Sequence, residues 1–479
     1  MNAAERLLAT GADGATALEC GDERMSYAQL REQVRRAAGS WRARGVEAGD
    51  RVFVIAPDSI DWVVAYLGVI WAGGVAVGVN PGLPPAELAP ILADSAPRFV
   101  WCEEPVEWAH VVRNDAQWHA ELAGARPVAV VPRDDEDPAL WIGTSGTTGT
   151  PKGAIHVQRT VTHAHSFGRG VLGLTARDRL YASSKLFFAY ALGNSLFAGL
   201  RCGATVILDR DWPTPERVEA MVARHRPTLV FSVPTLYLKM LRTGVADRLA
   251  GRGIRHFVSA GEALPPTTRR AWRDATGLAP TSGYGTTETL CLMLYGDDDS
   301  GLLTPTPLTQ LELRGADDEV PQRVWLRHPT VGIGYWNRPE AQADGFREGG
   351  WFSPGDLFLR RSDGRLEYAG RNDDMLKIAG QWVSTLWVEQ SLAGACGDTL
   401  QQVAAVGVTT AEGLSALSVL AVAAPGCQAE AVRRIAAAIE AMPRHRRPRW
   451  VHWLDALPLT ATGKLQRSRL GALHAQAAG

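Results

Sequence analysis

Residues 144–153 read TSGTTGTPKG, and they follow the apolar run ALWI of residues 139–142. Glycines let the backbone turn its N–H groups toward an anion without a Cβ in the way, and Ser and Thr hydroxyls add uncharged donors. Lys152 adds a point charge near the end of the segment. This composition after a strand-like run predicts a loop that holds phosphate groups.

The segment does not fit the P-loop of nucleotide hydrolases. That motif reads GxxxxGK followed by Ser or Thr, whose hydroxyl binds magnesium. Here Pro151 precedes Lys152 and Gly153 follows it, so the P-loop hydroxyl is missing from its position. A flexible Gly/Thr surface loop is the other interpretation of such a composition. The ordered pattern SGTTGxPKG favours the phosphate loop.

Length and composition limit what this loop can serve. The chain has 479 residues, more than one hydrophobic core usually supports, so we expect at least two domains. A hydrophobic fraction of 46% and a charged fraction of 21% are typical of a soluble globular enzyme. The net charge of -1 argues against a protein whose main partner is nucleic acid.

The cysteines and the N-terminus indicate a reducing compartment. The six cysteines are far apart and form no CxxC pair or Cys/His cluster, so neither a disulfide framework nor a zinc site is expected. The first residues, MNAAERLLATGADG, lack the basic and apolar regions of a secretory signal. We therefore expect a cytoplasmic protein.

Residues 62–79 carry no charged side chain and are long enough to span a membrane. The pair Gly73-Gly74 divides this segment into a helix-like part and a β-branched part. A buried helix that leads into a buried strand is the favoured interpretation over a membrane span.

Strand-like and helix-like runs alternate over the first 300 residues, which predicts βαβ units on parallel sheets. The expected strands include residues 51–56, 75–79, 204–208 and 228–232, and the expected helices include residues 27–44, 215–225 and 266–276. From about Leu311 short alternating runs such as 322–326 and 365–368 predict a small β-rich subdomain. Beyond it, strand-like residues 403–408 and 417–422 precede a helix-like run at 429–441.

The expected fold class is therefore α/β with two domains. Residues 1–372 form a large N-terminal domain of parallel-rich βαβ sheets plus the β-rich subdomain. Residues 373–479 form a small mobile α+β C-terminal domain, and the boundary lies at the polar junction near Asp373.

Four further motifs follow the phosphate loop along the chain: YGTTE at 284–288, SPGD at 353–356, GRNDD at 370–374 and PLTATGK at 458–464. Each alone has an ordinary interpretation, such as a turn with a capping glutamate. Together, in this order, they resemble the adenylate-forming superfamily of acyl-CoA synthetases, peptide-synthetase adenylation domains and luciferases. Residues 185–194 (KLFFAYALGN) and 375–384 (MLKIAGQWVS) most resemble the benzoate-CoA ligase branch.

That resemblance implies a ligase that works in two steps. A carboxylate attacks the α-phosphate of ATP to give an acyl-adenylate and pyrophosphate, and a thiol then displaces AMP to give a thioester. Attack of one anion on another requires cations and hydrogen-bond donors around the phosphates. The implied cofactors and substrates are ATP, Mg2+, coenzyme A as acceptor and an aromatic carboxylic acid.

The resemblance also assigns roles to residues of this chain. Lys464 would bridge the carboxylate and the α-phosphate, and Glu288 would hold the magnesium ion. Tyr284 would stack on adenine, with residues 259–264 lining the same side. The full set implied for ATP and AMP is Thr144, Ser145, Gly146, Thr147, Thr148, Lys152, Gly261, Glu262, Ala263, Tyr284, Gly285, Thr287, Asp356 and Arg371.

Asp356 and Arg371 suit the ribose, because a carboxylate offers two acceptor oxygens and a guanidinium donates. Asp373 would be the hinge about which the C-terminal domain swings between the two steps. The implied thiol channel includes Lys377, Gly380 and Trp382. The ordinary interpretations are a solvated surface lysine for Lys464 and a charged turn for residues 371–374.

The residues implied for the acyl pocket are Phe188, Ala189, Tyr190, Gly193, Ser282, Gly283, Cys291 and Leu292. We expect residues 186–190 to form a strand that brings aromatic side chains to the pocket, and Gly193 to permit close approach of a flat guest. An aromatic acid is favoured, with plain hydrophobic core as the alternative.

Cys291 stands where the benzoate-CoA ligase branch has a histidine. Replacing an imidazole by a thiol removes a polar ring and leaves more room, so a substituted benzoate is expected. No catalytic role is expected for Cys291, because the reaction needs no enzymatic nucleophile.

The thiol acceptor is left open. The basic run at 443–449 suits the phosphates of CoA or an acidic carrier protein, and a solvated surface is its ordinary interpretation. The leading prediction is an AMP-forming aryl acid-CoA ligase. The alternatives are a freestanding adenylation enzyme that loads an aryl acid onto a separate phosphopantetheinyl carrier protein, and a non-catalytic relative, against which the intact motifs speak. The oligomeric state is not set by the sequence, and a homodimer is one alternative.

Overall fold

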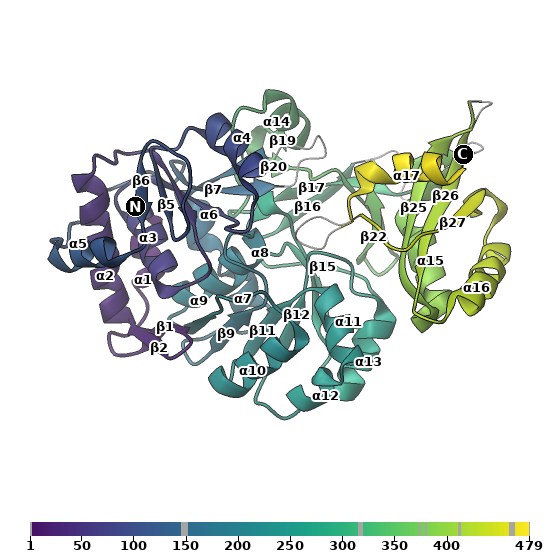
Figure 1. The fold of residues 1–479 in the computed structure, drawn as a ribbon, viewed down its shortest axis with the longest axis horizontal. Helices are drawn as coiled ribbons and strands as arrows, with labels where there is room; N and C mark the ends of the chain where they lie inside the picture. Colours follow the sequence, from purple (N-terminus) through teal and green to yellow (C-terminus); the bar gives the residue numbers. More distant parts are fainter. Residues whose placement is uncertain are drawn as a thin grey trace. The chain divides into compact units, whose positions relative to one another are not determined.

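The computed structural model describes residues 2–144, 152–314, 320–372, 375–378, 381–410, 413–458 and 465–478 (Figure 1). The chain divides into two compact units. The first comprises Met1–Glu312 and Trp325–Pro354, and the second comprises Leu313–Val324 and Gly355–Gly479.

The first unit contains a nine-stranded sheet with the order β15-β14-β13-β12-β11-β9-β10-β1-β2. Its six central strands run parallel, and β2, β14 and β15 each pair antiparallel with the strand that precedes them in the chain. The strands are β1 (Thr16–Cys20), β2 (Glu23–Ser26), β9 (Arg179–Ala182), β10 (Thr205–Leu208), β11 (Leu229–Ser232), β12 (His256–Ser259), β13 (Thr281–Tyr284), β14 (Leu294–Gly296) and β15 (Thr304–Pro305).

A second sheet of this unit has the order β18-β8-β7-β4-β3-β5-β6. Its strands are β3 (Arg51–Ile55), β4 (Val75–Val79), β5 (Phe99–Cys102), β6 (Val111–Arg113), β7 (Pro138–Thr144), β8 (Lys152–Val157) and β18 (Gly334–Tyr335). Strands β8 and β18 pair antiparallel at one edge, while the other five are parallel. The short strands β19 (Phe346–Arg347) and β20 (Trp351–Phe352) pair with each other.

The helices of the first unit are α1 (Ala3–Leu8), α2 (Tyr27–Ala43), α3 (Ile60–Trp71), α4 (Pro85–Ser95), α5 (Ala116–Gly124), α6 (Gln158–His163), α7 (Ser166–Gly170), α8 (Ala189–Ala191), α9 (Ala198–Arg201), α10 (Pro215–His225), α11 (Pro234–Arg242), α12 (Val245–Leu249), α13 (Pro266–Thr276) and α14 (Pro339–Gly345). A π-helix, η1 (Leu192–Phe197), joins α8 to α9, and a 3-10 turn, η2, covers Thr287–Thr289.

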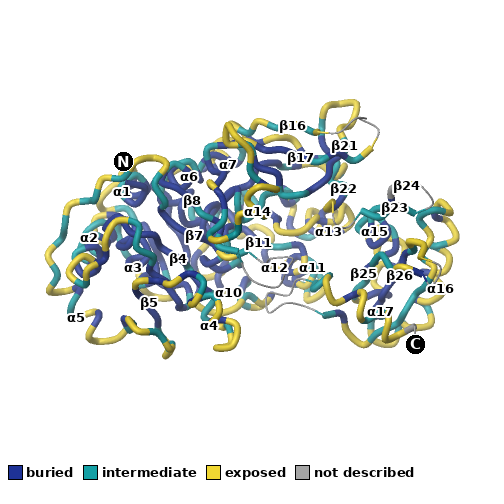
Figure 2. The backbone as a smooth tube through the Cα atoms, turned by 90° about the horizontal axis from the view of Figure 1, so that it is seen from above, coloured by how far each residue is buried: buried dark blue, intermediate teal, exposed yellow. Residues whose placement is uncertain are grey.

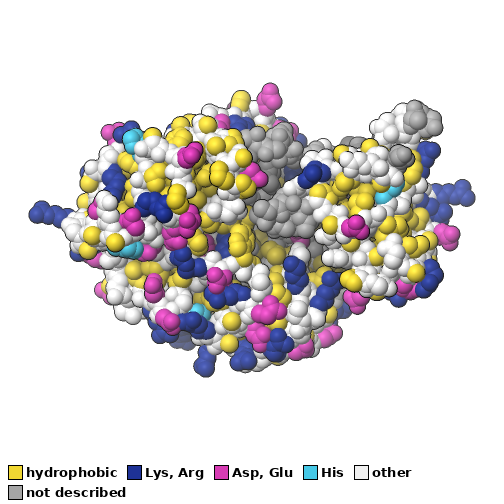
Figure 3. Space-filling model, viewed as in Figure 1, with side chains coloured by type: hydrophobic (Ala, Val, Ile, Leu, Met, Phe, Trp, Pro, Cys, Tyr) yellow, Lys and Arg dark blue, Asp and Glu magenta, His cyan; other side chains and the backbone are white. Residues whose placement is uncertain are grey.

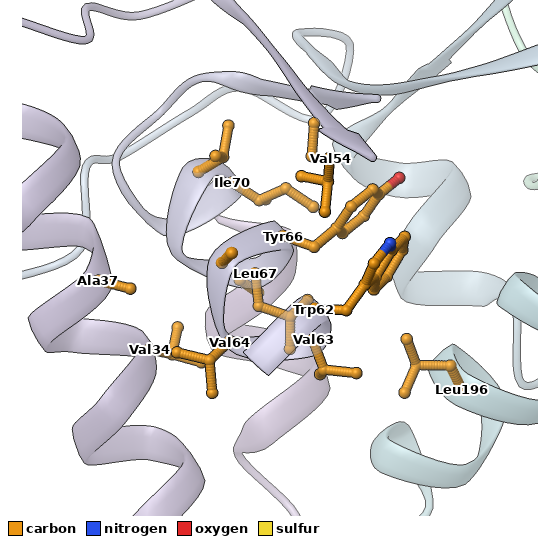
Figure 4. Packing of buried hydrophobic residues seen from close by; sticks show 14 of the residues in the cluster. Val34, Ala37, Val54, Trp62, Val63, Val64, Tyr66, Leu67, Ile70 and Leu196 are labelled. Carbon is orange, nitrogen blue, oxygen red and sulfur yellow. The ribbon is translucent and has the colours of Figure 1, made fainter. Parts of the chain in front are cut away.

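Helices α2 and α3 pack in the core between the two sheets. A capping box of Ser26 and Gln29 starts α2, whose apolar stripe then faces α3. Helix α3 is buried on nearly every side, and its Trp62 and Tyr66 rings stack at 4.5 Å (Figure 4). Residues of β1, β10, β3 and β7 join the same hydrophobic cluster. One core therefore ties both sheets together.

The large sheet is covered on both faces. Tyr181, Val230 and Phe257 point into one cluster with α10–α13, where Trp272 packs edge-on against Tyr237. The alternate strand residues, such as Leu180 and Phe231, face α7 and α9. Figure 2 shows the central strands of both sheets as buried, the outer face of α2 as mostly intermediate and that of α5 as largely exposed.

The second unit holds the antiparallel pair β21 (Asp356–Arg360) and β22 (Leu366–Arg371) and the hairpin β23 (Met375–Ile378) with β24 (Gln381–Ser384). A three-stranded sheet of β25 (Leu400–Thr409), β26 (Ser415–Ala423) and β27 (Trp450–Trp453) packs against α15 (Thr385–Cys396) and α16 (Gln428–Ala441), and α17 spans Leu470–Ala478. Strands β16 (Gln310–Arg314) and β17 (Gln322–Arg327) lie where the chain passes between the units.

Most predicted elements are confirmed. Helices α10 and α13 have the predicted bounds, and strand β4 does as well. The doubtful segment at 62–79 is the helix α3 followed by β4, as expected. Within the described residues, every helix is too short or too polar to cross a membrane. The predicted boundary at Asp373 stays a prediction, because residues 373 and 374 lie outside the described part of the chain.

The strand predicted at 186–190 is wrong. Phe188 N–H donates to the carbonyl of Lys185 at 2.9 Å, which closes a turn, and α8 begins at Ala189. Side-chain contacts replace strand pairing here. The Asp58 carboxylate accepts the Leu186 N–H at 3.1 Å, and the buried Lys185 ammonium donates to the carbonyl of Asp209 at 2.6 Å.

On the face drawn in Figure 3, positive and negative side chains are interspersed, in keeping with the net charge of -1. The six cysteines all lie in described residues and are free.

The contact between α2 and α3 gives the first testable prediction. A Cβ added at Gly68 of α3 would lie 2.6 Å from the Cβ of Ala37 on α2, so Gly68→Ala should force the helices apart. We expect it to lower the free energy of unfolding by about 1–3 kcal/mol, as overpacking does. Urea unfolding measures this.

Gly124→Ala is the matched control, because Gly124 is also helical and a Cβ there would have no atom of the described residues within 4 Å. Its stability should stay the same or rise slightly. Equal stability of the two variants would contradict the packing described for α2 and α3.

Candidate active site

The phosphate loop is fixed at both of its ends. Thr144 and Lys152 are register partners at the open end of the antiparallel pair β7–β8. The predicted residues between them, Ser145, Gly146, Thr147 and Thr148, lie outside the described part of the chain. The loop therefore leaves and re-enters the sheet at neighbouring positions.

Lys152 and Glu288 both contact Tyr335, a residue that none of the sequence motifs includes. The Lys152 Nζ is 5.4 Å from the centroid of the Tyr335 ring, and the Tyr335 hydroxyl donates to Glu288 Oε1 at 2.6 Å. Tyr335 reaches this position because β18 pairs with β8, with Tyr335 opposite Ala154. A cation, a hydroxyl and a carboxylate thus meet beside the phosphate loop.

A signal for Tyr335 was present in the sequence. Residues 334–339 read GYWNRP, a turn-rich segment with two aromatic residues. Trp336 anchors it, because its backbone N–H donates to Gly153 at 2.9 Å and its indole N–H donates to Asp94 at 3.0 Å.

The YGTTE segment is held in place through two of its own backbone carbonyls. His156 Nε2 lies 2.9 Å from the carbonyl of Thr287, and the Gly332 N–H donates to the carbonyl of Glu288 at 2.8 Å. Burial lowers the pKa of His156 to about 4, and a carbonyl can only accept, so the neutral ring carries its proton on Nε2. The position of Glu288 is therefore set by two elements outside its own turn.

The residues predicted for adenine emerge from adjacent parallel strands. Ser259 at the end of β12 is in register with Ser282 of β13. Gly261, with φ of +92°, and Tyr284 each follow two residues later. Carboxyl ends of neighbouring parallel strands are where open α/β sheets bind ligands.

Two further residues predicted for the nucleotide have defined contacts. Glu262 accepts a hydrogen bond from Thr235 at 3.1 Å. A glycine is required at position 285 because a Cβ there would lie 2.7 Å from the carbonyl of Cys291.

Two of the residues predicted for the acyl pocket share one hydrophobic cluster. Tyr190 and Leu292 both belong to it, on the sheet face opposite α10–α13. The Tyr190 hydroxyl lies 3.0 Å from the carbonyl of Val258, and burial raises the Tyr190 pKa well above its ordinary value. Leu292 covers Gly283, where a Cβ would lie 2.4 Å from its side chain. Phe188 packs against Phe187 with ring centroids 4.4 Å apart.

The packing of the backbone requires a glycine at position 193. A Cβ at this position would lie 2.1 Å from the carbonyl oxygen of Leu290, so the backbone itself needs the glycine. Close approach of a flat guest stays a prediction.

Cys291 is enclosed by hydroxyl groups. Its thiol lies 3.2 Å from Thr330 Oγ1 and 3.7 Å from Ser166 Oγ, and the residue is 2% exposed. Burial raises the Cys291 pKa to about 11, so the thiol is neutral near pH 7. A neutral, enclosed thiol is a poor nucleophile. The extra room expected beside it stays a prediction.

The second unit contains the predicted ribose pair. Asp356 and Arg371 are register partners across β21–β22, and Arg371 Nε lies 3.9 Å from Asp356 Oδ1. Tyr368 donates to the same oxygen at 3.3 Å, which sequence analysis missed. In the β23–β24 hairpin, the backbones of Lys377 and Trp382 are partners. The predicted residues Asp373, Gly380 and Lys464 lie outside the described part of the chain.

The donor set fits magnesium only as part of a nucleotide complex. Within the described residues, no three His, Cys, Asp or Glu side chains gather around one point. Mg2+ is usually held by one or two carboxylates together with substrate phosphates. Glu288, beside Lys152 and the phosphate loop, is suited to supply one such carboxylate.

Residues 7–336 match the family model described as AMP-binding enzyme. The chain belongs to this family. The 3-hydroxybenzoate-CoA ligase of Aromatoleum sp. (strain CIB) is 36% identical, over 98% of this chain and 96% of that protein. The benzoate-CoA ligase of Thauera aromatica is 33% identical, over 93% of this chain and 90% of that protein.

The fold agrees with a solved structure. A benzoate CoA ligase from Burkholderia xenovorans LB400 superimposes with a TM-score of 0.85 at 30% identity, covering 98% of this chain and 99% of that one. The family match of this AMP-binding enzyme includes Thr144, Lys152, Glu288 and Tyr335. The α/β fold predicted from the sequence is therefore confirmed.

The Tyr335 hydrogen bond gives a prediction about nucleotide binding. Tyr335→Phe removes the hydroxyl from Glu288 and should weaken MgATP binding about tenfold, since hydrogen bonds to charged groups contribute about 1.5–3 kcal/mol. Isothermal calorimetry measures the affinity.

Tyr66→Phe is the control, because the buried Tyr66 hydroxyl has no hydrogen-bond partner among the described residues and the residue lies in α3 within the core. Unchanged MgATP affinity in Tyr335→Phe would show that this hydroxyl does not help position Glu288.

His156 predicts an acid-dependent loss of stability. Its pKa in the folded protein is about 4, against an ordinary value of 6.5. As pH falls through this window the unfolded chain binds a proton that the folded protein refuses, so stability falls by roughly 3 kcal/mol. His156→Gln should flatten the dependence of unfolding free energy on pH between 6.5 and 4.

At pH values well above this window the His156 ring is neutral in both the folded and the unfolded protein. The difference in unfolding free energy between wild type and variant there reports only lost packing. His165 and His328, whose pKa values burial also lowers to about 4, should keep part of the slope. Parallel stability curves for the two proteins would refute the assignment to His156.

Proposed function

We propose that this protein activates a benzoate-class carboxylic acid with ATP and transfers it to coenzyme A, giving an aryl-CoA thioester, AMP and pyrophosphate. One observation carries the proposal. Lys152, Tyr335 and Glu288 meet at the ends of the phosphate-loop hairpin, in a chain whose relatives over nearly its whole length are hydroxybenzoate- and benzoate-CoA ligases.

In the first step, the substrate carboxylate attacks the α-phosphate and pyrophosphate leaves. Lys152 and the donors of residues 144–148 would bind the pyrophosphate portion, where negative charge gathers. Magnesium, when bound with the nucleotide, neutralises phosphate charge, and Glu288 would supply a ligand. Tyr335 keeps one Glu288 oxygen hydrogen-bonded and so limits the orientations of that carboxylate. We assign to Lys464 the bridge between the carboxylate and the α-phosphate.

In the second step, the CoA thiol attacks the acyl carbonyl and AMP leaves. Asp356 and Arg371 would hold the ribose, with Tyr368 fixing the Asp356 carboxylate. We propose a hinge at Asp373 and a role for Lys377, Gly380 and Trp382 in guiding the thiol. Such alternation between half-reactions lets one protein bind two different transition states in turn.

The acid is proposed to be benzoate or a hydroxybenzoate. Tyr190 and Leu292 supply apolar surface from two segments of one cluster, which suits a flat ring. CoA is favoured over a carrier protein, because the relatives named for CoA span at least nine-tenths of both chains. A cytoplasmic location, where six free cysteines stay reduced, is part of the proposal.

The proposal is tested by a screen for pyrophosphate release over benzoate, its hydroxy and amino derivatives, and short aliphatic acids. Each acid is offered with MgATP alone, with CoA, and with a phosphopantetheinylated carrier protein. We expect release with one or more benzoates and multiple turnovers only with CoA, because AMP leaves when the thioester forms.

Mass spectrometry of the CoA reactions identifies the thioester. Sustained turnover with the carrier alone would move the assignment to an adenylation enzyme that loads a carrier. Release with aliphatic acids alone would overturn the aryl assignment.

A further inference from the structure

Asn194 lies in the π-helix η1 and is 2% exposed. Its amide nitrogen donates to the carbonyl of Tyr190 at 3.0 Å, and its amide oxygen accepts the N–H of Leu292 at 3.3 Å. Leu292 is 98 residues away along the chain. One buried side chain thus connects two distant segments, and each of them carries a residue predicted to hold the acid.

The two segments are also in direct contact next to Asn194. Gly193 approaches the carbonyl of Leu290 so closely that no Cβ fits between them. Leu290 has a φ of +60°, an uncommon value for a leucine, so the backbone is strained where it meets η1. Strain of this kind persists only where surrounding contacts impose it, and the Asn194 bond to Leu292 is one such contact.

The far side of each connected residue is fixed as well. The Tyr190 hydroxyl is held at the carbonyls of Val258 and Ser232, and Leu292 rests on Gly283. The Asn194 amide adds a direct hydrogen-bonded link between the backbones of Tyr190 and Leu292. Interruption of α-helical geometry by a π-helix is frequent at functional sites.

We propose that Asn194 is a positioning residue that determines which aryl acids are accepted. It acts by setting the spacing of Tyr190 and Leu292, and it does not itself contact the acid. This inference rests on the proposed function and identifies one determinant of its substrate class. An acid whose ring substituent fits at the native spacing should lose its advantage in kcat/KM over other acids once the spacing relaxes.

Asn2 offers a matched comparison within the same unit. It is fully buried, and its amide nitrogen donates to the carbonyl of Ile70 at 2.6 Å while its amide oxygen accepts the N–H of Ala4 at 2.9 Å. Its hydrogen-bond partners, Ile70, Val131 and Ala4, are not among the predicted acyl residues. Loss of the Asn2 amide should therefore cost stability in the same way but leave acid preference unchanged.

The test compares wild type, Asn194→Ala, Asn194→Asp and Asn2→Ala. Steady-state kcat/KM is measured for benzoate, its hydroxybenzoate isomers and 2-aminobenzoate, with the KM for ATP and the melting temperature recorded for each protein. The carboxylate of Asn194→Asp keeps an acceptor for Leu292 but has no donor for Tyr190, so this variant changes that bond with little change in volume.

We expect the ratio of kcat/KM between the best and a poorer acid to change about tenfold in Asn194→Ala, the scale set by small changes in pocket shape. The shift should be in the KM for the acid, with the KM for ATP unchanged. Asn194→Asp should change the ratio in the same direction.

An Asn194→Ala protein with the wild-type ranking of acids would overturn the inference, as would an equal change of ranking in Asn2→Ala. If Asn194→Ala does not fold, Asn194→Asp and Asn194→Ser decide by the same criterion. If the wild-type protein releases pyrophosphate with none of the acids tested, the proposed function fails, and this inference fails with it. The two failures are therefore distinguishable.

Discussion

The pairing of β8 with β7 on one side and with β18 on the other fixes where phosphate chemistry can occur in this protein. The β7 pairing brings the two ends of the phosphate loop, Thr144 and Lys152, side by side. The β18 pairing carries Tyr335 to the same edge, where its hydroxyl meets Glu288. Lys152 at the end of the loop, Glu288 and Tyr335 come from three distant parts of the chain, and Tyr335 contacts both of the others. The apolar core around α2 and α3 supports this edge, because it ties the sheet that carries it to the larger sheet.

How much the sequence could predict depended on whether the signal was local. Helices α10 and α13 were predicted with their true bounds, because Pro at their first turns and an apolar stripe are local features. The same holds for β4, a β-branched run after a glycine pair. The strand predicted at 186–190 was wrong, because its geometry is set by Asp58, which lies 128 residues from Leu186.

The candidate site shows the same division. Motif residues such as Lys152 and Glu288 stand out from their sequence context. The segment around Tyr335 has a local turn signal, but the contacts of Tyr335 and Asn194 come from partners 47 and 98 residues away, which no local pattern predicts. At Gly193 the structure shows a packing reason for the glycine, since the Leu290 carbonyl fills the space where a Cβ would be. Cys291 is bound by Thr330 and Ser166, contacts that no local pattern predicts.

The central claim is that the protein forms an aryl-adenylate at the site beside the phosphate loop. Exchange of labelled pyrophosphate into ATP, measured without any thiol, tests this step alone because it reports reversal of adenylate formation. The account predicts exchange that requires a benzoate or hydroxybenzoate and Mg2+. Absence of exchange with every aryl acid, or exchange that proceeds equally well without an acid, would contradict it.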